Sequence, residues 1–252
     1  MKMEERSIGF DRKIPLPWIN AVADWAAAGY DKQQINAKLD QLLEGKVAGS
    51  NSGSAKGKTK TVLLHVWVSV PPQVEPLRED ALRLLREHSG RTRLALHWGM
   101  CLATYPFFRS IAETVGRLLR LQESASVAQV RRRTEEQFGE RQVVPRALQR
   151  VLRTFAEWGV LRATSDKGVY TSAPPLMIED GDILAWLIEA TLVSNGSNTG
   201  MLQSILQSPA LFPFNFNAFN FRSFENHKRL EWYQQSIDQH IIAIRTPLVA
   251  RQ

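Results

Sequence analysis

Cysteine is nearly absent from this sequence, since Cys101 is the single one among 252 residues. One cysteine excludes an intrachain disulfide and any metal site built from several cysteines. Long apolar runs are also missing: the longest, residues 62–72 and 183–193, are interrupted by polar side chains and are too short to cross a bilayer. The first 13 residues lack the apolar stretch of a secretory signal. We therefore expect a cytoplasmic protein that does not enter a membrane.

Lysine is absent from residues 91–162, although thirteen arginines and only six acidic residues lie there. This segment alone carries a net charge of +7, which equals the excess of the whole chain. A charge excess confined to one segment indicates a surface that faces a polyanion. The alternative is an arginine-rich helical surface that is simply solvated.

Helical periodicity dominates the sequence, so we expect a mainly α-helical fold. Within the first 104 residues, the helices are expected at residues 18–28, 31–43, 76–88 and 91–104. Residues 45–58 are rich in Gly, Ser and Lys and are expected to form a flexible loop. The expected domains are a helical N-terminal domain (1–104), a central domain (105–175) and a mixed, largely helical C-terminal extension with a phenylalanine-rich segment (176–252).

The order of elements in the central segment is the strongest signal in the sequence. A first helix is expected at residues 107–121, and a second at 127–138, where Ser126 and Gln129 have the spacing of a capping box. A third helix is expected at residues 145–158, because Pro145 favours a helix start and Gly159 favours a helix end.

Two short strands follow the third helix and are joined by a turn at residues 165–168. Three helices followed by a β-hairpin resemble the winged helix-turn-helix superfamily over roughly residues 107–174. The resemblance implies that helix 145–158 is the recognition helix and that the hairpin at 163–173 is the wing.

The apolar side chains of helix 145–158 must pack on the other two helices, which leaves its polar side chains together on the outer face. The expected DNA-binding residues on this face are Arg146, Gln149, Arg150 and Arg153. Arginine can bind phosphates or guanine edges, and glutamine can read adenine in the major groove. Supporting contacts to the DNA backbone are expected from Arg131, Arg132, Arg133 and Lys167.

Other interpretations of this segment stay open. The turn at residues 139–144 is longer than the tight turn of the minimal helix-turn-helix motif. Winged domains also bind proteins, so an adaptor or assembly subunit with a solvated arginine face is the main alternative. A stand-alone transcription regulator is a further one.

The patterns typical of enzymes are weak in this chain. Residues 53–59 approach a phosphate-binding loop but have three residues between the glycines where four are needed, and the expected element before them is a helix. His97 and Cys101 share a helical face, although their apolar neighbours favour packing over nucleophilic chemistry. The acidic residues at 179–182 fit the start of a helix better than a metal site. We expect no catalytic residue, metal or cofactor.

The run at residues 211–221 is rich in Phe and Asn. The alternation of Phe212, Phe214 and Phe216 favours an extended segment with one buried face over a platform that stacks on unpaired bases.

A more specific resemblance, over roughly residues 20–245, is to the BrxA-type proteins of bacterial phage-defence (BREX) islands. The residues that carry it are Leu96–Met100, Tyr105–Phe108, Gly116–Leu118, Trp158–Leu161 and Leu211–Phe214. None of these runs is a catalytic motif. The resemblance implies a small, non-enzymatic DNA-binding component that works beside methyltransferase, phosphatase-like and ATPase proteins of the defence system.

Overall fold

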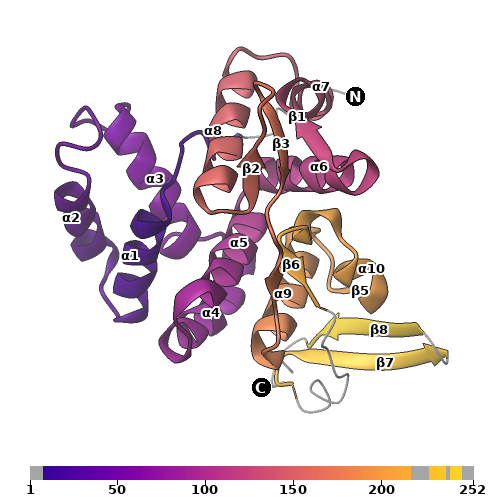
Figure 1. The fold of residues 1–252 in the computed structure, drawn as a ribbon. Helices are drawn as coiled ribbons and strands as arrows, with labels where there is room; N and C mark the ends of the chain where they lie inside the picture. Colours follow the sequence, from indigo (N-terminus) through magenta and orange to yellow (C-terminus); the bar gives the residue numbers. More distant parts are fainter. Residues whose placement is uncertain (1–7, 217–226, 237–238, 246–252) are drawn as a thin grey trace, which may run out of the picture.

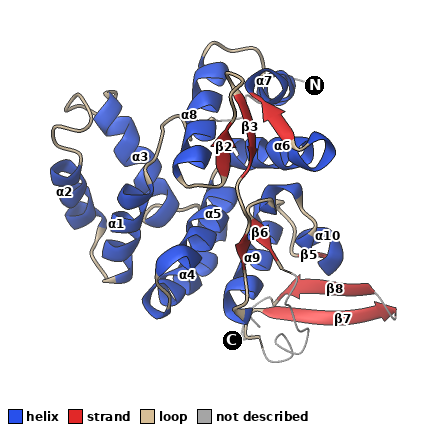
Figure 2. Ribbon diagram, viewed as in Figure 1, coloured by secondary structure: helices blue, strands red, loops and turns tan. Residues whose placement is uncertain are grey.

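The computed structural model describes residues 8–216, 227–236 and 239–245, and it confirms a mainly α-helical fold (Figures 1 and 2). The helices are α1 (Leu16–Ala27), α2 (Lys32–Leu42), α3 (Ala55–Trp67), α4 (Glu75–Glu87), α5 (Arg93–Thr104), α6 (Pro106–Gln122), α7 (Val127–Phe138), α8 (Val143–Glu157), α9 (Gly181–Ser194) and α10 (Leu202–Leu206). The strands are β1 (Ser124–Ser126), β2 (Leu161–Ala163), β3 (Val169–Ser172), β4 (Leu176–Met177), β5 (Thr199–Met201), β6 (Phe214–Asn215), β7 (Leu230–Ser236) and β8 (Gln239–Ile244). Within the described residues, no helix is both long enough and apolar enough to span a bilayer.

The N-terminal helices follow the local signals of the sequence. Asp31 begins α2 with a capping box, in which its side chain accepts from the backbone N–H of Gln34 and the Gln34 side chain accepts from the N–H of Asp31. The expected flexible loop at residues 45–58 is shorter than predicted, because residues 55–58 form the first turn of α3. Ser54 caps this helix by accepting from the N–H of Gly57.

Helix α5 lies at the centre of the molecule, between α4 and the helices α6 and α9 (Figure 1). It is buried along nearly its whole length. Trp98 shows why the surrounding elements are fixed: its indole N–H donates to the carbonyl of Ala210 at 2.9 Å. The same C-terminal segment approaches α6 so closely that a Cβ at Gly116 would lie 1.9 Å from the carbonyl oxygen of Pro209. Buried side chains from all three predicted domains (1–104, 105–175 and 176–252) therefore form one continuous core.

The central segment contains α6, α7 and α8 where the sequence predicts them, and Ser126 caps α7 in a capping box with Gln129. Helix α7 ends before Gly139, whose φ of +78° suits glycine. Strand β1, between α6 and α7, was not predicted. It pairs antiparallel with β3, which also pairs with β2, so the three-stranded sheet has the order β1-β3-β2.

The C-terminal part departs most from the prediction, because it holds β4 to β8 in addition to α9 and α10. Strands β4 and β6 pair in parallel, and a second sheet has the order β5-β8-β7. Phe214 lies in β6 and is buried, whereas Phe219, Phe221 and Phe224 lie outside the described residues. The acidic residues at 179–182 do mark a helix start: Asp180 caps α9, since its carboxylate accepts from the N–H groups of Asp182 and Ile183.

One buried carboxylate ties the β7–β8 hairpin to the helices. Glu189 on α9 is 1% exposed, and both of its oxygens accept from the guanidinium of Arg229, which lies just before β7. Arg229 also contacts Asp80 of α4 at 3.0 Å. Burial raises the pKa of Glu189, while the hydrogen bond to Arg229 opposes that shift.

Candidate nucleic-acid interface

The outer face of α8 carries polar side chains that make no hydrogen bond or ion pair with other described residues. Arg146, Gln149 and Arg153 are exposed, and none of the three makes a hydrogen bond or ion pair with another described residue. Their spacing of three and four residues places them on one stripe. The opposite face of the helix, which includes Leu148, Val151, Leu152 and Phe155, is buried in the core. The predicted orientation of this helix is therefore correct.

Arg150 lies at the edge of this stripe and is already engaged. Its Nη1 donates to the backbone carbonyl of Asp11 at 2.7 Å, and the residue is only half-exposed. Burial lowers the pKa of Arg150, and the nearby charges of Arg12, Arg146 and Arg153 lower it further. Part of its hydrogen-bonding capacity is thus spent within the protein.

A groove separates α8 from the turn between β2 and β3. It has a volume of about 240 Å³, and its lining residues are Val127, Gln149, Leu152, Arg153, Lys167, Gly168 and Tyr170. Lys167 lies at the turn, is exposed, and has no ion-pair partner among the described residues. The structure therefore brings Gln149, Arg153 and Lys167 together around one groove, although they come from different elements.

The groove continues towards the start of α7 as a second hollow of about 350 Å³. Arg131, Pro145 and Gln149 are among its lining residues. Helix α7 is held against the turn here, because the N–H of Val127 donates to the carbonyl of Gly168 at 2.8 Å. Three of the predicted elements (α7, α8 and the β2–β3 turn) thus form the walls of one continuous depression.

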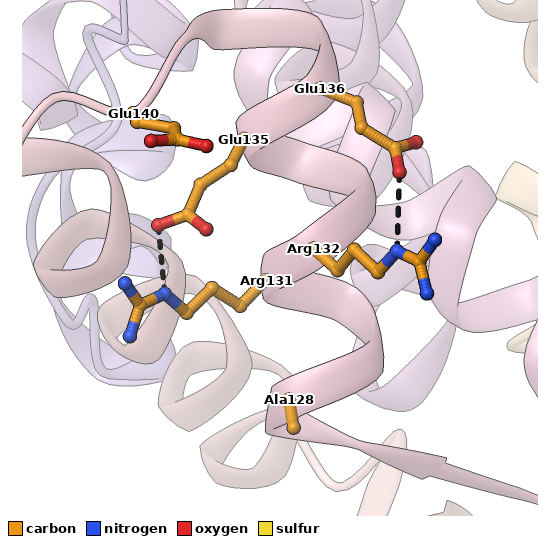
Figure 3. A pocket seen from close by; sticks show the side chains of 6 residues that line it. All are labelled: Ala128, Arg131, Arg132, Glu135, Glu136 and Glu140. Atoms are coloured by element: carbon orange, nitrogen blue, oxygen red, sulfur yellow. Dashed lines mark hydrogen bonds and ion pairs between the residues drawn. The ribbon is translucent and has the colours of Figure 1, made fainter.

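The remaining predicted arginines on α7 are placed differently. Arg131 pairs with Glu135 at 2.7 Å, and Arg132 pairs with Glu136 at 3.5 Å (Figure 3). Together with Glu140, these side chains line a hollow of about 460 Å³ that carries more acidic than basic groups. The surface beside Arg132 therefore does not favour a polyanion.

Arg133 is exposed and makes no ion pair within the described part of the chain. It follows Arg131 by two residues, so it projects about 200° around the helix axis from the side chain that lines the groove. The structure thus gathers Arg146, Gln149, Arg153 and Lys167, places Arg131 and Arg150 at the margins, and leaves Arg132 and Arg133 apart.

Sequence reasoning did not single out Tyr170, which lines the groove and is half-buried. Its ring is on the α8 side of β3, in register with Ala125 of β1 and Ala163 of β2. An aromatic residue between two small cross-strand neighbours could have been recognised only with knowledge that β1 pairs with β3, and the sequence does not show this pairing.

The alternative chemistries weighed from sequence find little geometric support. The N–H groups of Lys56 and Gly57, at the start of α3, already donate to the carbonyl of Ala48 and the hydroxyl of Ser54. Within the described residues, no group of three or more His, Cys, Asp or Glu side chains is placed to hold a metal ion.

His97 and Cys101 are both fully buried in α5. Burial lowers the pKa of His97 to about 3 and raises that of the Cys101 thiol, so both groups are neutral at pH 7. A nucleophilic cysteine needs the thiolate form and access to a substrate. The pair therefore fits a packing role. His97 Nε2 lies 2.7 Å from Asn20 Oδ1, so the neutral ring donates its Nε2–H to this oxygen.

The buried His97 should make the protein sensitive to mild acid. The unfolded chain binds a proton at a pKa near 6.5, whereas the folded chain does not until about pH 3, so folding stability is lost as the pH falls below 6.5. Between pH 7 and pH 5 this residue should remove about 2 kcal/mol from the free energy of unfolding. Urea unfolding at the two pH values measures the difference.

Between pH 7 and pH 5, the free energy of unfolding of the His97→Gln variant should fall by about 2 kcal/mol less than that of the wild type. This difference does not depend on how stable the variant is at pH 7. The matched change His88→Gln, at a histidine that keeps partial exposure, should retain the wild-type difference. Equal pH dependence in wild type and His97→Gln would contradict the assignment.

The interface is thus a stripe on α8 with unused basic groups, bordered by a groove and a basic turn. No charged partner within the described residues neutralises Arg146, Arg153 or Lys167. Comparison of the chain with protein-family models, curated proteins and solved structures gives no match.

Proposed function

We propose that residues 106–172 are a winged helix-turn-helix domain that binds double-stranded DNA, with α8 as the recognition helix and the β2–β3 hairpin as the wing. The order of elements supports this assignment, since a strand lies between the first two helices and pairs with the far strand of the hairpin. So does the position of α8, which packs one face on the core and turns the other outwards.

The observation that carries the proposal is the set of unpaired groups on the α8 stripe and at the groove beside it. Arg146, Arg153 and Lys167 are exposed cations without a partner among the described residues, and Gln149 lies between the two arginines. Arginine and lysine bind backbone phosphates, while arginine and glutamine side chains on a helix can reach base edges in the major groove. The width of that groove, about 12 Å, admits an α-helix.

The wider role follows from the resemblance to BrxA-type proteins. We propose that the chain is a cytoplasmic, non-enzymatic DNA-binding component of a bacterial phage-defence system of the BREX kind, acting with other proteins of that system.

A gel-shift titration on random duplex DNA at several salt concentrations tests the DNA proposal. With about four to six phosphates contacted, the slope of log affinity against log salt should be about −4 to −5. A slope near zero, or no shift with micromolar protein at low salt, would contradict DNA binding and would favour the adaptor alternative.

A further inference from the structure

The N-terminal segment, residues 8–14, is part of the same surface as α8. The backbone N–H of Ile14 donates to Thr154 Oγ1 at 3.0 Å, and Arg150 donates to the carbonyl of Asp11. In Figure 1 the indigo chain start reaches α8 from the side of α3, whereas β2 and β3 lie on the other side of the helix. Ile8, Phe10 and Ile14 are buried, so the segment is anchored in the core.

Helix geometry confirms that the wing and this segment border α8 on different sides. Leu152 lines the groove towards the wing, and Thr154 accepts the hydrogen bond from the N-terminal segment. Two residues along an α-helix correspond to a rotation of about 200°, so these two side chains project in nearly opposite directions. The exposed stripe of Arg146 and Arg153 therefore runs between two flanks.

The N-terminal flank holds two cations and one side-chain donor that has no hydrogen-bond partner. The Arg12 side chain is 13% exposed, and its Nε is buried without a hydrogen-bond partner. Among the described residues, Arg12 forms an ion pair with Asp11, at 3.5 Å, and its Nη1 donates to the Asp11 carbonyl at 2.8 Å. Lys13, the next residue, is 46% exposed and pairs with Glu157 at the end of α8. The flank thus carries two cations beside the exposed stripe, and a phosphate bound there would compete with Asp11 and Glu157 for them.

Two guanidinium groups meet at one carbonyl, because Nη1 of Arg12 and Nη1 of Arg150 both donate to the backbone oxygen of Asp11, at 2.8 and 2.7 Å. Besides burial, the charge of Arg12 is the strongest influence that lowers the pKa of Arg150, followed by the charges of Arg146 and Arg153. The carboxylate of Asp11 opposes this effect but cannot balance four guanidinium groups. A bound anion would relieve the mutual repulsion of these groups.

We propose that Arg12 and Lys13 bind a backbone phosphate of duplex DNA, on the strand opposite to the one that Lys167 contacts. The inference rests on the proposed function and adds a third contacting element to it. A helix in the major groove has one phosphate backbone on each side, and α8 has one basic flank on each side. Two flanks of this kind match a duplex and not a single strand.

The first test compares charge removal with charge retention at position 12. Arg12→Gln should reduce the salt slope by about one unit and weaken duplex binding severalfold, whereas Arg12→Lys should keep the wild-type slope. The matched control is Arg83→Gln, an exposed residue on α4. An unchanged slope in a folded Arg12→Gln protein would overturn the inference, as would single-stranded DNA that binds as tightly as duplex.

A second test measures proximity and does not require changing Arg12. Cys101 is fully buried, so a cysteine introduced at the surface can be labelled selectively with iron–EDTA. Labelled Lys13→Cys and Lys167→Cys proteins should both cleave bound duplex DNA, and labelled Arg83→Cys should not. Cleavage from position 167 without cleavage from position 13 would overturn this inference and leave the proposed function standing. Failure of the unmodified protein to bind DNA would instead refute the proposed function itself.

Discussion

Replacing Arg146 and Arg153 together with alanine should weaken duplex DNA binding about 30-fold or more, because each lost arginine contact costs about 1–3 kcal/mol. The salt slope should become shallower by about two units, near one for each lost phosphate contact. Folding should be unaffected, since both side chains are exposed and make no hydrogen bond or ion pair within the described residues. Gel shifts at several salt concentrations, with circular dichroism as a check on folding, measure both effects.

A matched pair of arginines lies on α4. Arg83 pairs with Glu87, and Arg86 donates to the carbonyl of Ala27, so both are engaged within the protein. Replacing this pair with alanine removes the same charge and should change the salt slope much less. If both double variants lost the same DNA affinity and the same salt slope, the attraction would be diffuse and α8 would not be docked in the groove of the DNA.

Arg150 is left out of the double variant for a structural reason. Its donation to the carbonyl of Asp11 helps hold the N-terminal segment on α8, so an alanine there would disturb packing as well as DNA contact. The sequence could place Arg150 on the outer face of the helix. It could not reveal that a segment far away in the chain covers that edge, because such contacts depend on the tertiary fold.

The arginines of α7 show a signal that was present in the sequence. Glu135 and Glu136 follow Arg131 and Arg132 by four residues, the spacing at which side chains on a helix form ion pairs. Local spacing therefore already indicated that these two charges are partly balanced. Arg146 and Arg153 have no acid at that spacing except for Glu157, four residues after Arg153, and Glu157 pairs with Lys13 instead.

Local signals predicted the helices and the β2–β3 hairpin well, and the other strands poorly. The capping boxes at Asp31 and Ser126 mark helix starts in the structure, because a cap depends on residues within one turn. Strand β1 has only the residues Ser-Ala-Ser and is defined by its pairing with β3. The β7–β8 hairpin is not predicted from the local pattern, although its second strand contains the apolar run Ile241–Ile244. The ion pair between Arg229, just before β7, and the buried Glu189 of α9 ties this hairpin to the helices.

Replacing Phe155 with alanine should have the largest effect on stability, a loss of about 3–5 kcal/mol in the free energy of unfolding. Its ring is fully buried on the inner face of α8 and lies 4.8 Å from the ring of Trp98 and 5.1 Å from that of Phe108, measured between centroids. These neighbours are fixed by other contacts, such as the bond from Trp98 to Ala210, so they cannot close the cavity. Urea unfolding followed by tryptophan fluorescence measures the loss.

Position 155 also distinguishes a core residue from one that stacks on bases. The matched change Val143→Ala, at a residue of α8 that is 43% exposed, should alter the free energy of unfolding by less than about 0.5 kcal/mol. At a temperature where the Phe155→Ala protein is still folded, its DNA affinity should stay close to the wild-type value, because Phe155 faces away from Arg146 and Arg153. A Phe155→Ala protein that kept its full stability and lost DNA binding would place the aromatic ring, and with it the whole inner face of α8, in contact with the nucleic acid.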